Sequence, residues 1–131
     1  MLKEDAPEFG FVGTGTGIAP LLSMMRTLVM KRVKKPLKFF FGFQFMEKYL
    51  YREELAEYAK LPNFELQVIT SREKTPEGKQ GYVTDLLRTY DFSKHQDMTF
   101  FLCGTPRAID DVIAALKAKG FPDERINREK W

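Results

Sequence analysis

The chain has 131 residues, a length typical of a single domain, and we expect one domain over residues 1–131. Its one cysteine, Cys103, and its one histidine, His95, exclude an intrachain disulfide, a multi-cysteine zinc site and a protein-held iron–sulfur cluster, so no metal site is expected. Lys and Arg number 21 against 18 Asp and Glu, and this net charge of +3 is too small to indicate a nucleic-acid partner.

The sequence shows neither a membrane span nor a secretion signal. No apolar run approaches the roughly 18 residues needed to cross a bilayer, and the acidic start "MLKEDAPE" lacks the apolar segment of a signal peptide. We therefore expect no membrane contact and a cytoplasmic location. One basic cluster reads either as a solvated helix end or as a docking site for an acidic protein; it comprises Lys31, Arg32, Lys34, Lys35 and Lys38.

Apolar runs alternate with helical patterns along the whole chain. In chain order, the pattern predicts a strand at 9–12, a helix at 18–33, a strand at 36–44, a helix at 53–60, a strand at 63–71, a short helix at 82–90, a strand at 98–104, a helix at 106–119 and a short strand at 125–131. The run at 36–44 is continuously apolar, as expected for a strand covered on both faces. The predicted fold class is α/β: a three-layer Rossmann-like domain with a five-stranded parallel sheet and helices on both faces.

Ligands of such sheets bind at the carboxyl ends of the strands. Three segments leave predicted strands at that edge: residues 13–20, 69–82 and 102–107. Candidate functional residues are therefore sought in these segments.

The first segment is rich in glycine. Gly13, Gly15 and Gly17 permit positive φ and allow a ligand to approach bare backbone, and the helix that follows points its N–H groups at the same place. Pro20 suits the first helical turn, where its missing N–H has no carbonyl partner. Phosphate or pyrophosphate is the expected ligand; the alternative is a tight strand-to-helix turn without one.

Two common nucleotide loops do not fit this segment. A Walker loop needs Lys and Ser or Thr after its last glycine, where this chain has Ile18 and Ala19. The spacing G-x-G-x-x-G is absent, and Gln44 replaces the acid expected at the end of the second strand. The ribose must therefore be held elsewhere.

Five stretches together resemble a known family. "FVGTGTGIAPLLSMMR", "LYREEL", "SRE", "QGYVTDLL" and "FLCGTPRAI" are similar, in the same order and over nearly the whole chain, to the NAD(P)H-binding domain of the ferredoxin–NADP reductase superfamily. In that family this domain follows a flavin-binding β-barrel, and hydride passes from NAD(P)H to the flavin. The barrel's signatures are not found here, so the resemblance places FAD on a missing domain or a partner chain.

The resemblance assigns roles around the glycine segment and the fourth strand. Cys103 and Gly104, with Thr105 next in the motif, match the place where a thiol packs against the nicotinamide carbon that donates hydride. From the residues alone, Cys103 reads as a small buried hydrophobic side chain. The pyrophosphate loop of the family matches Gly13, Thr14, Gly15, Thr16, Gly17, Ile18 and Ala19, followed by Pro20.

A second set of roles concerns the adenosine half of the nucleotide. Ser71 and Arg72 match the residues that hold the ribose and, in NADP-using members, its 2′-phosphate. Lys74, Lys79 and Tyr82 would complete a basic pocket with an aromatic face for adenine; the alternative is a solvated turn. The stretch "GYVTD" is more similar to NADH-using members, so the choice between NADH and NADPH stays open.

The chain end also resembles the family. Glu129, Lys130 and Trp131 match an ending in which the aromatic lies beside the flavin and the acid near the nicotinamide, so the resemblance implies a catalytic set of Cys103, Glu129 and Trp131. A packing aromatic is the alternative for Trp131. The chain departs from many members at Gly42-Phe43-Gln44, where they carry an arginine after the glycine.

The leading hypothesis is the nucleotide-binding domain of a flavin-dependent NAD(P)H reductase, inactive as the isolated chain. Its expected partners are a flavin-binding domain and an electron-acceptor protein. One alternative is a flavin-free nucleotide-binding subunit that regulates or transfers electrons. Another is a flavodoxin-like mononucleotide binder, because a fold alone does not fix a function.

Overall fold

The computed structural model describes residues 6–15 and 17–128 and contains one parallel β-sheet. Its spatial order is β3-β2-β1-β4-β5, and every neighbouring pair is parallel. The predicted fold class is thereby confirmed. The strands are β1 (Glu8–Thr14), β2 (Leu37–Phe43), β3 (Phe64–Thr70), β4 (Met98–Cys103) and β5 (Ile126–Arg128).

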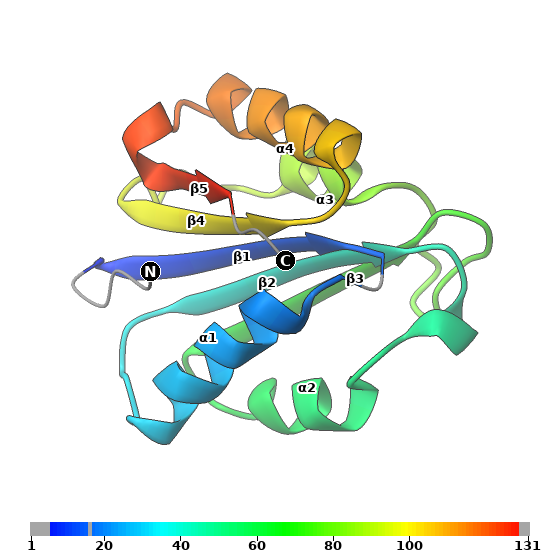
Figure 1. Ribbon diagram of the computed structural model, residues 1–131, viewed down its shortest axis with the longest axis horizontal. Coiled ribbons are helices and arrows are strands. Elements are labelled where there is room, and N and C mark those ends of the chain that lie inside the picture. Colours follow the sequence, from blue (N-terminus) through cyan, green and yellow to red (C-terminus); the bar gives the residue numbers. More distant parts are fainter. Residues whose placement is uncertain (1–5, 16, 129–131) are drawn as a thin grey trace.

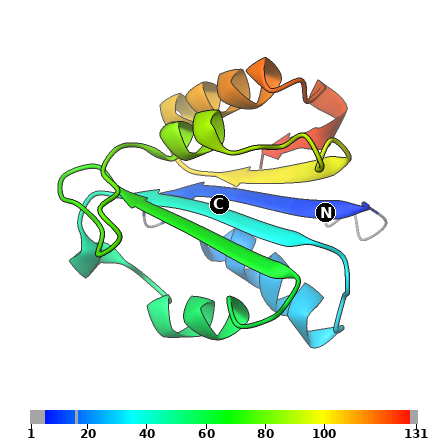
Figure 2. The same cartoon turned by 180° about the vertical axis from the view of Figure 1, so that it is seen from behind.

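Helices cover both faces of the sheet. Helices α1 (Ala19–Met30) and α2 (Arg52–Tyr58) lie on one face, and α3 (Val83–Thr89) and α4 (Pro106–Ala118) lie on the other (Figures 1 and 2). Two short 3₁₀ helices, η1 (Met46–Lys48) and η2 (Asp123–Arg125), were not predicted. Three residues are too few to show the 3.6-residue periodicity on which helix prediction depends.

The sheet is buried because its central strands are apolar on both sides. Every residue of β2 is buried, as its continuous apolar sequence predicted. Alternate side chains point to opposite faces, so Phe39 and Phe41 pack against α1 and α2, whereas Phe40 packs under α3 and α4. The sheet thus separates two hydrophobic cores.

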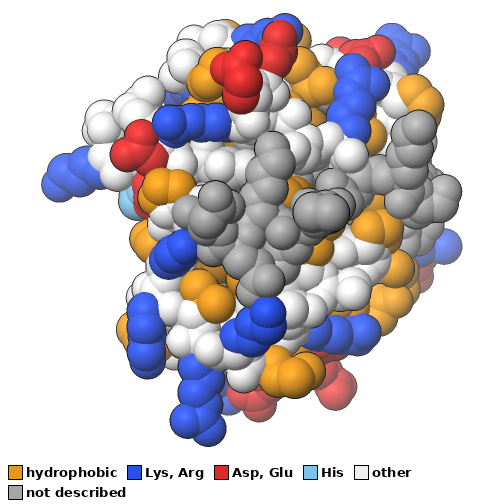
Figure 3. Space-filling model, turned by 60° about the vertical axis from the view of Figure 1, so that its left-hand side comes forward, with side chains coloured by type: hydrophobic (Ala, Val, Ile, Leu, Met, Phe, Trp, Pro, Cys, Tyr) orange, Lys and Arg blue, Asp and Glu red, His pale blue; other side chains and the backbone are white. Residues whose placement is uncertain are grey.

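The predicted basic cluster is not one surface. Lys31, Arg32 and Lys34 are exposed in the loop from α1 to β2, but Lys38 is 8% exposed within β2. The face shown in Figure 3, on the side where β1 begins, carries several Lys and Arg side chains together with acidic ones. The cluster lies at the amino ends of the strands, opposite the edge where ligands of such sheets bind.

The buried ammonium of Lys38 is neutralised within the fold. Its Nζ lies 2.9 Å from Glu65 Oε1, which also accepts a 2.7 Å hydrogen bond from Tyr90 Oη. Burial alone would lower the pKa of Lys38, but its hydrogen bonds to Tyr90 and Glu65 raise that pKa above its ordinary value. Burial alone would raise the pKa of Glu65, but hydrogen bonds from Tyr90, Lys38 and Gln67 lower it.

We predict that Glu65→Gln lowers the free energy of unfolding by about 2 kcal/mol, because the ammonium of Lys38 stays buried without an anionic partner. Urea denaturation followed by circular dichroism measures the loss. The control Glu57→Gln acts on an ion pair with Lys60 whose side chains are 68% and 74% exposed, so we expect a change below about 0.5 kcal/mol. Equal losses in the two variants would contradict the prediction.

The same pair gives a pH dependence. Because folding lowers the pKa of Glu65, its stabilising contribution is present at neutral pH and is lost as the pH falls through its folded-state pKa. Wild type and Glu65→Gln should therefore approach each other in stability in acid. A stability difference that stays constant down to the acid transition would show that the charge of Glu65 does not stabilise the fold.

Candidate functional site

A cavity of about 920 Å³ lies where β1, β2, β3 and β4 end. All three segments predicted at this edge contribute to its wall: Thr14 and Gly15 from the first, Ser71 and Tyr82 from the second, and Thr105 from the third. Residues 42–44 of β2 and the loop after it form a further part of the wall. The cavity therefore follows the carboxyl edge of the sheet.

The glycines at the end of β1 serve two different purposes. Gly13 is buried, and a Cβ there would lie 2.8 Å from Ile18 Cγ2, so its missing side chain allows α1 to pack on the strand. Gly15 has φ +69°, and a Cβ there would meet no atom of the described residues within 4 Å. Gly15 is thus required by its backbone conformation, and the space beside it is open to a ligand.

Among the described residues, no side chain caps the start of α1. The N-cap residue, Ile18, is buried, and its apolar side chain cannot accept a hydrogen bond. No acidic residue lies in the first turn. Pro20 lies in that turn, as predicted. The positive end of the helix is therefore not offset by an acidic side chain of its first turn, which favours an anion beside it.

The loop after β4 packs against the loop after β1. A Cβ on Gly104 would collide with Thr14 Oγ1, so this glycine lets the two loops meet. Thr105 is the N-cap of α4, where its Oγ1 accepts a 3.3 Å hydrogen bond from Ala108 N. Thr14 and Thr105 both line the cavity and bring two hydroxyl groups to it.

Cys103 lies behind this wall. It is 2% exposed, it pairs with Gly13 across β4 and β1, and its Sγ donates to the carbonyl oxygen of Gly17. It is not among the residues that line the cavity. The thiol ties the end of β4 to the glycine segment.

The turn after β3 forms the far end of the cavity. Ser71 is half-buried in the wall, and Tyr82, whose side chain is 69% exposed, lines the cavity at the start of α3. Two hydrogen bonds with Asp85 hold the backbone of Tyr82 there. Tyr82 N donates to Asp85 Oδ2, and the carbonyl oxygen of Tyr82 accepts from Asp85 N, each at 2.9 Å. The two ends of this turn thus contribute a hydroxyl, from Ser71, and an exposed aromatic ring, from Tyr82, to the same cavity.

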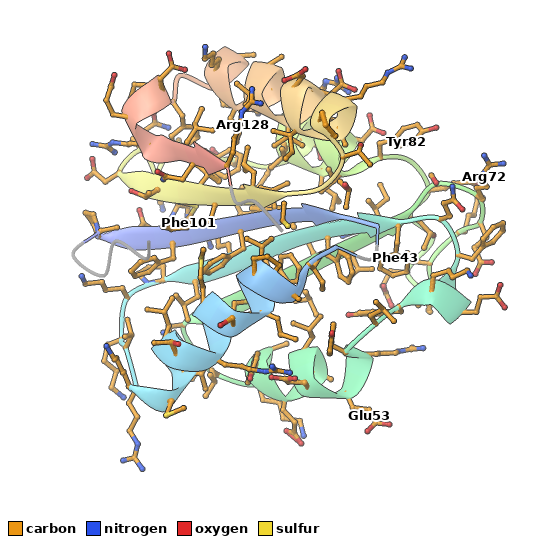
Figure 4. The ribbon with its side chains drawn as sticks, in the orientation of Figure 1. Phe43, Glu53, Arg72, Tyr82, Phe101 and Arg128 are labelled. Carbon is orange, nitrogen blue, oxygen red and sulfur yellow. The ribbon has the colours of Figure 1, made fainter. Side chains whose placement is uncertain are left out.

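Two predicted basic residues lie outside the wall. Arg72 is exposed on the outer loop at this edge (Figure 4), and it does not line the cavity. Lys79 Nζ donates a 2.7 Å hydrogen bond to Gln67 Oε1 on β3, so its charge is directed along the edge strand. The predicted basic pocket of Arg72 and Lys79 is therefore not assembled in this structure.

Three charged residues of the wall were not named as site residues: Lys48 in η1, and Arg107 and Asp111 on α4. Arg107 ends the segment 102–107 that was predicted at this edge, but it was given no role. Arg107 and Asp111 are four positions apart, which places them on one helix face, and this spacing was the available signal. Lys48 gave no signal because η1 itself was not predicted. Gln44, noted in the sequence as a departure, also lines the cavity.

The predicted site residues thus divide into three groups. The cavity wall contains Thr14, Gly15, Ser71, Tyr82 and Thr105. Outside the wall are Gly13, Gly17, Ile18, Ala19, Pro20, Arg72, Lys79, Cys103 and Gly104. Thr16, Glu129 and Trp131 lie outside the described residues.

Residues 6–15 and 17–128 offer neither a metal centre nor a membrane-spanning helix. No three His, Cys, Asp or Glu side chains in this part of the chain are grouped as metal ligands would be. None of its helices combines the length and apolar character of a membrane span.

Comparison with known families identifies the kind of domain. The sequence profile described as "Oxidoreductase NAD-binding domain" matches residues 11–113. This chain belongs to that family. Its membership and its structural matches confirm the resemblance to reductases of the ferredoxin–NADP reductase type.

Curated relatives are longer than this chain. The reductase subunit of an aromatic O-demethylase from Amycolatopsis sp. is 26% identical over 130 residues, which cover 98% of this chain and 39% of the relative. One subunit of a Na⁺-translocating NADH-quinone reductase from Klebsiella pneumoniae is 31% identical over 137 residues, covering 95% and 32%. The chain thus spans about a third of the length of these relatives.

Solved structures show the same fold. A cytochrome P450 reductase from Amycolatopsis superposes with a TM-score of 0.83 at 24% identity, covering 99% of this chain and 40% of that one. A ferredoxin NADP⁺ reductase from Neisseria gonorrhoeae, solved with bound FAD and NADP, superposes with a TM-score of 0.80 at 21% identity. The match covers 95% of this chain and 56% of that one. At these identities the likeness concerns the fold.

We predict different costs for alanine at the two glycines of the first segment. Gly13→Ala should lower the free energy of unfolding by about 1–3 kcal/mol, because its Cβ overpacks against Ile18. Gly15→Ala should cost about 1–2 kcal/mol from backbone strain alone. Urea denaturation measures both. An unchanged free energy of unfolding in Gly13→Ala would contradict the packing role of Gly13.

Proposed function

We propose that this chain binds NAD(P)H along the carboxyl edge of its sheet and holds the nicotinamide for hydride transfer to a flavin. The FAD would be carried by another domain or by a partner chain. The observation that supports this most is that a cavity in a member of the oxidoreductase NAD-binding family combines the glycine loop, the Ser71 turn and the Thr105 loop. In this reaction NAD(P)H supplies a hydride and the flavin accepts it.

The residues present fit the pyrophosphate. Gly15 leaves bare backbone with open space beside it, and the uncapped start of α1 adds a positive dipole end. The hydroxyl groups of Thr14 and Thr105 stand at the same part of the wall. These groups would hold the pyrophosphate by hydrogen bonds without neutralising it by a buried cation.

The residues at the far end fit the adenosine. The exposed ring of Tyr82 offers a face for adenine, and the hydroxyl of Ser71 can hydrogen-bond the ribose. Both project from the turn and helix start that follow β3. A dinucleotide bound in this way lies across the ends of β4, β1, β2 and β3.

The nicotinamide end is proposed to lie beside β4. Cys103 is the last residue of that strand, and its thiol already holds Gly17. We retain Cys103, Glu129 and Trp131 as the residues proposed to contact the reacting rings. In this proposal the protein orients two cofactors, and it does no covalent chemistry itself.

The proposal gives the chain the role of a reductase domain. The Amycolatopsis relative is a reductase subunit, and a relative from Rhodococcus jostii is the reductase component of a propane 2-monooxygenase. By analogy, we propose that an electron-acceptor protein receives the electrons after the flavin.

We predict that Gly15→Val lowers the affinity for NADH at least tenfold, because the side chain fills the space that the pyrophosphate needs. Isothermal titration calorimetry on the purified chain measures this. The matched control is Gly78→Val: Gly78 has φ +86°, also has no atom within 4 Å of its Cβ position, and lies outside the cavity wall. Equal losses in both variants would refute the glycine loop as the nucleotide site.

We further predict that the 131-residue chain purifies without flavin and does not reduce dyes with NADH, because the family profile covers a nucleotide-binding domain only. Absorption spectroscopy in the visible range, where oxidised flavin absorbs, detects bound flavin. A yellow protein would contradict the proposal that FAD is held elsewhere. If the chain binds NADH but no added flavin-binding domain restores dye reduction, the flavin-free alternative is favoured.

A further inference from the structure

We infer that Lys48, and not Arg72, is the residue that reads the 2′ position of the adenosine ribose, so that acceptance of NADPH depends on Lys48. The inference rests on the proposed function and adds a specificity-determining residue to it. It goes against the assignment that the family resemblance suggests.

The first argument is which cations face the cavity. Among the described residues, Lys48 and Arg107 are the only Lys or Arg side chains in its wall. Arg72 is exposed outside the wall, and Lys79 is engaged by Gln67 at 2.7 Å. A phosphate in the cavity can therefore meet Lys48 or Arg107 without a rearrangement of the protein.

The second argument places Lys48 at the adenosine end. Strands β2 and β3 pair along their whole length, from Leu37 with Phe64 to Phe43 with Thr70. The contact continues past the strand ends, because Ser71 N donates to Phe43 O at 2.9 Å. The segment that carries Lys48 therefore starts beside Ser71.

Two more hydrogen bonds fix this neighbourhood. Arg72 N donates to Gln44 O at 3.0 Å, and Met46 N donates to Glu73 Oε2 at 3.3 Å. The second bond ties the first residue of η1 to the turn that follows Ser71. Lys48, two residues later in η1, is held at the same end of the cavity as the hydroxyl of Ser71.

Arg107 belongs to the other end. It follows β4, and β1 lies between β4 and β2 in the sheet. Two strand spacings of about 4.8 Å separate β4 from β2, and each cation lies on the element that follows one of these two strands. This order of the elements puts Arg107 on the pyrophosphate side of the proposed dinucleotide and Lys48 on the adenosine side.

The third argument is charge. Lys48 forms no salt bridge with any described residue, and its side chain is exposed to the cavity. The Glu73 carboxylate lies close by through its bond to Met46 N, and its charge opposes a 2′-phosphate. The ammonium of Lys48 offsets that charge, so its removal leaves the phosphate facing an acid.

The test compares three single substitutions. Lys48→Ala removes the proposed cation, and Arg72→Ala removes the alternative. Lys94→Ala is the control, since Lys94 is an exposed lysine outside the wall and has no role in the proposed site. Calorimetric titrations use NADPH and NADH, and also adenosine 2′-phosphate and adenosine 5′-phosphate as probes of the adenosine end alone. Circular dichroism and urea denaturation check that each variant is folded.

We expect Lys48→Ala to lower the affinity for NADPH and for adenosine 2′-phosphate about tenfold or more, because a charge-assisted hydrogen bond is lost. NADH and adenosine 5′-phosphate should change less than about twofold. Lys48→Arg should retain most of the affinity for NADPH. The loss of NADPH affinity in Lys48→Ala should shrink as salt is raised from about 50 to about 500 mM, because the screening length becomes roughly threefold shorter.

Three results would overturn the inference. A selective loss of NADPH in Arg72→Ala without one in Lys48→Ala would assign the 2′ position to Arg72. A second result is an equal loss of affinity for NADPH and NADH in Lys48→Ala, or a wild type that binds NADH well and NADPH not at all. Either outcome would show that Lys48 does not bind a 2′-phosphate, while the proposed function stands. A wild type that binds neither dinucleotide would refute the proposed function and the inference together.

Discussion

The parallel pairing of β1 with both β2 and β4 is the constraint on which the site depends. The chain passes from β1 to β2 and β3 on one side and then crosses to β4 on the other. As a result, the loop after β1 leads to α1 on one face, and the loop after β4 leads to α4 on the opposite face (Figure 1). A crevice opens where loops leave a sheet toward opposite faces, and the 920 Å³ cavity lies there.

Small residues let the walls of this crevice come close together. Gly104 allows the β4 loop to touch Thr14, and Gly42 lies beneath Val83, whose Cβ would be 3.1 Å from a Cβ at that position. Gly13 admits Ile18 in the same way. Gly15 differs from all three, because open space lies beside it. Glycines with close neighbours thus let the walls pack together, and Gly15 leaves open space in the cavity.

A polar network stabilises the sheet near the adenosine end. Lys79 binds Gln67, Gln67 Nε2 donates to Glu65 Oε2 at 2.7 Å, and Glu65 holds Lys38. The network satisfies the buried ammonium of Lys38 and covers the polar face of β3, which is an edge strand. It also commits Lys79 to a structural role. The cation of the cavity wall at this end is consequently Lys48 of η1.

The sequence by itself determined the fold class, because a continuous apolar run such as Leu37–Phe43 and the alternation of strands with helices have few other arrangements. It also placed Thr14, Gly15, Ser71, Tyr82 and Thr105 at one edge, since the carboxyl ends of parallel strands meet there. Family membership added the nucleotide.

Only the tertiary structure decided which side chains face the cavity. Arg72 and Lys79 are basic residues in the expected turn, but a sequence does not show that Gln67 on β3 binds Lys79 or that Arg72 lies outside the wall. Lys48 became visible only through η1, which is fixed by the bond from Met46 N to the distant Glu73. The physical reason is that strand and helix patterns are local, whereas side-chain direction in loops is set by contacts between residues far apart in the chain.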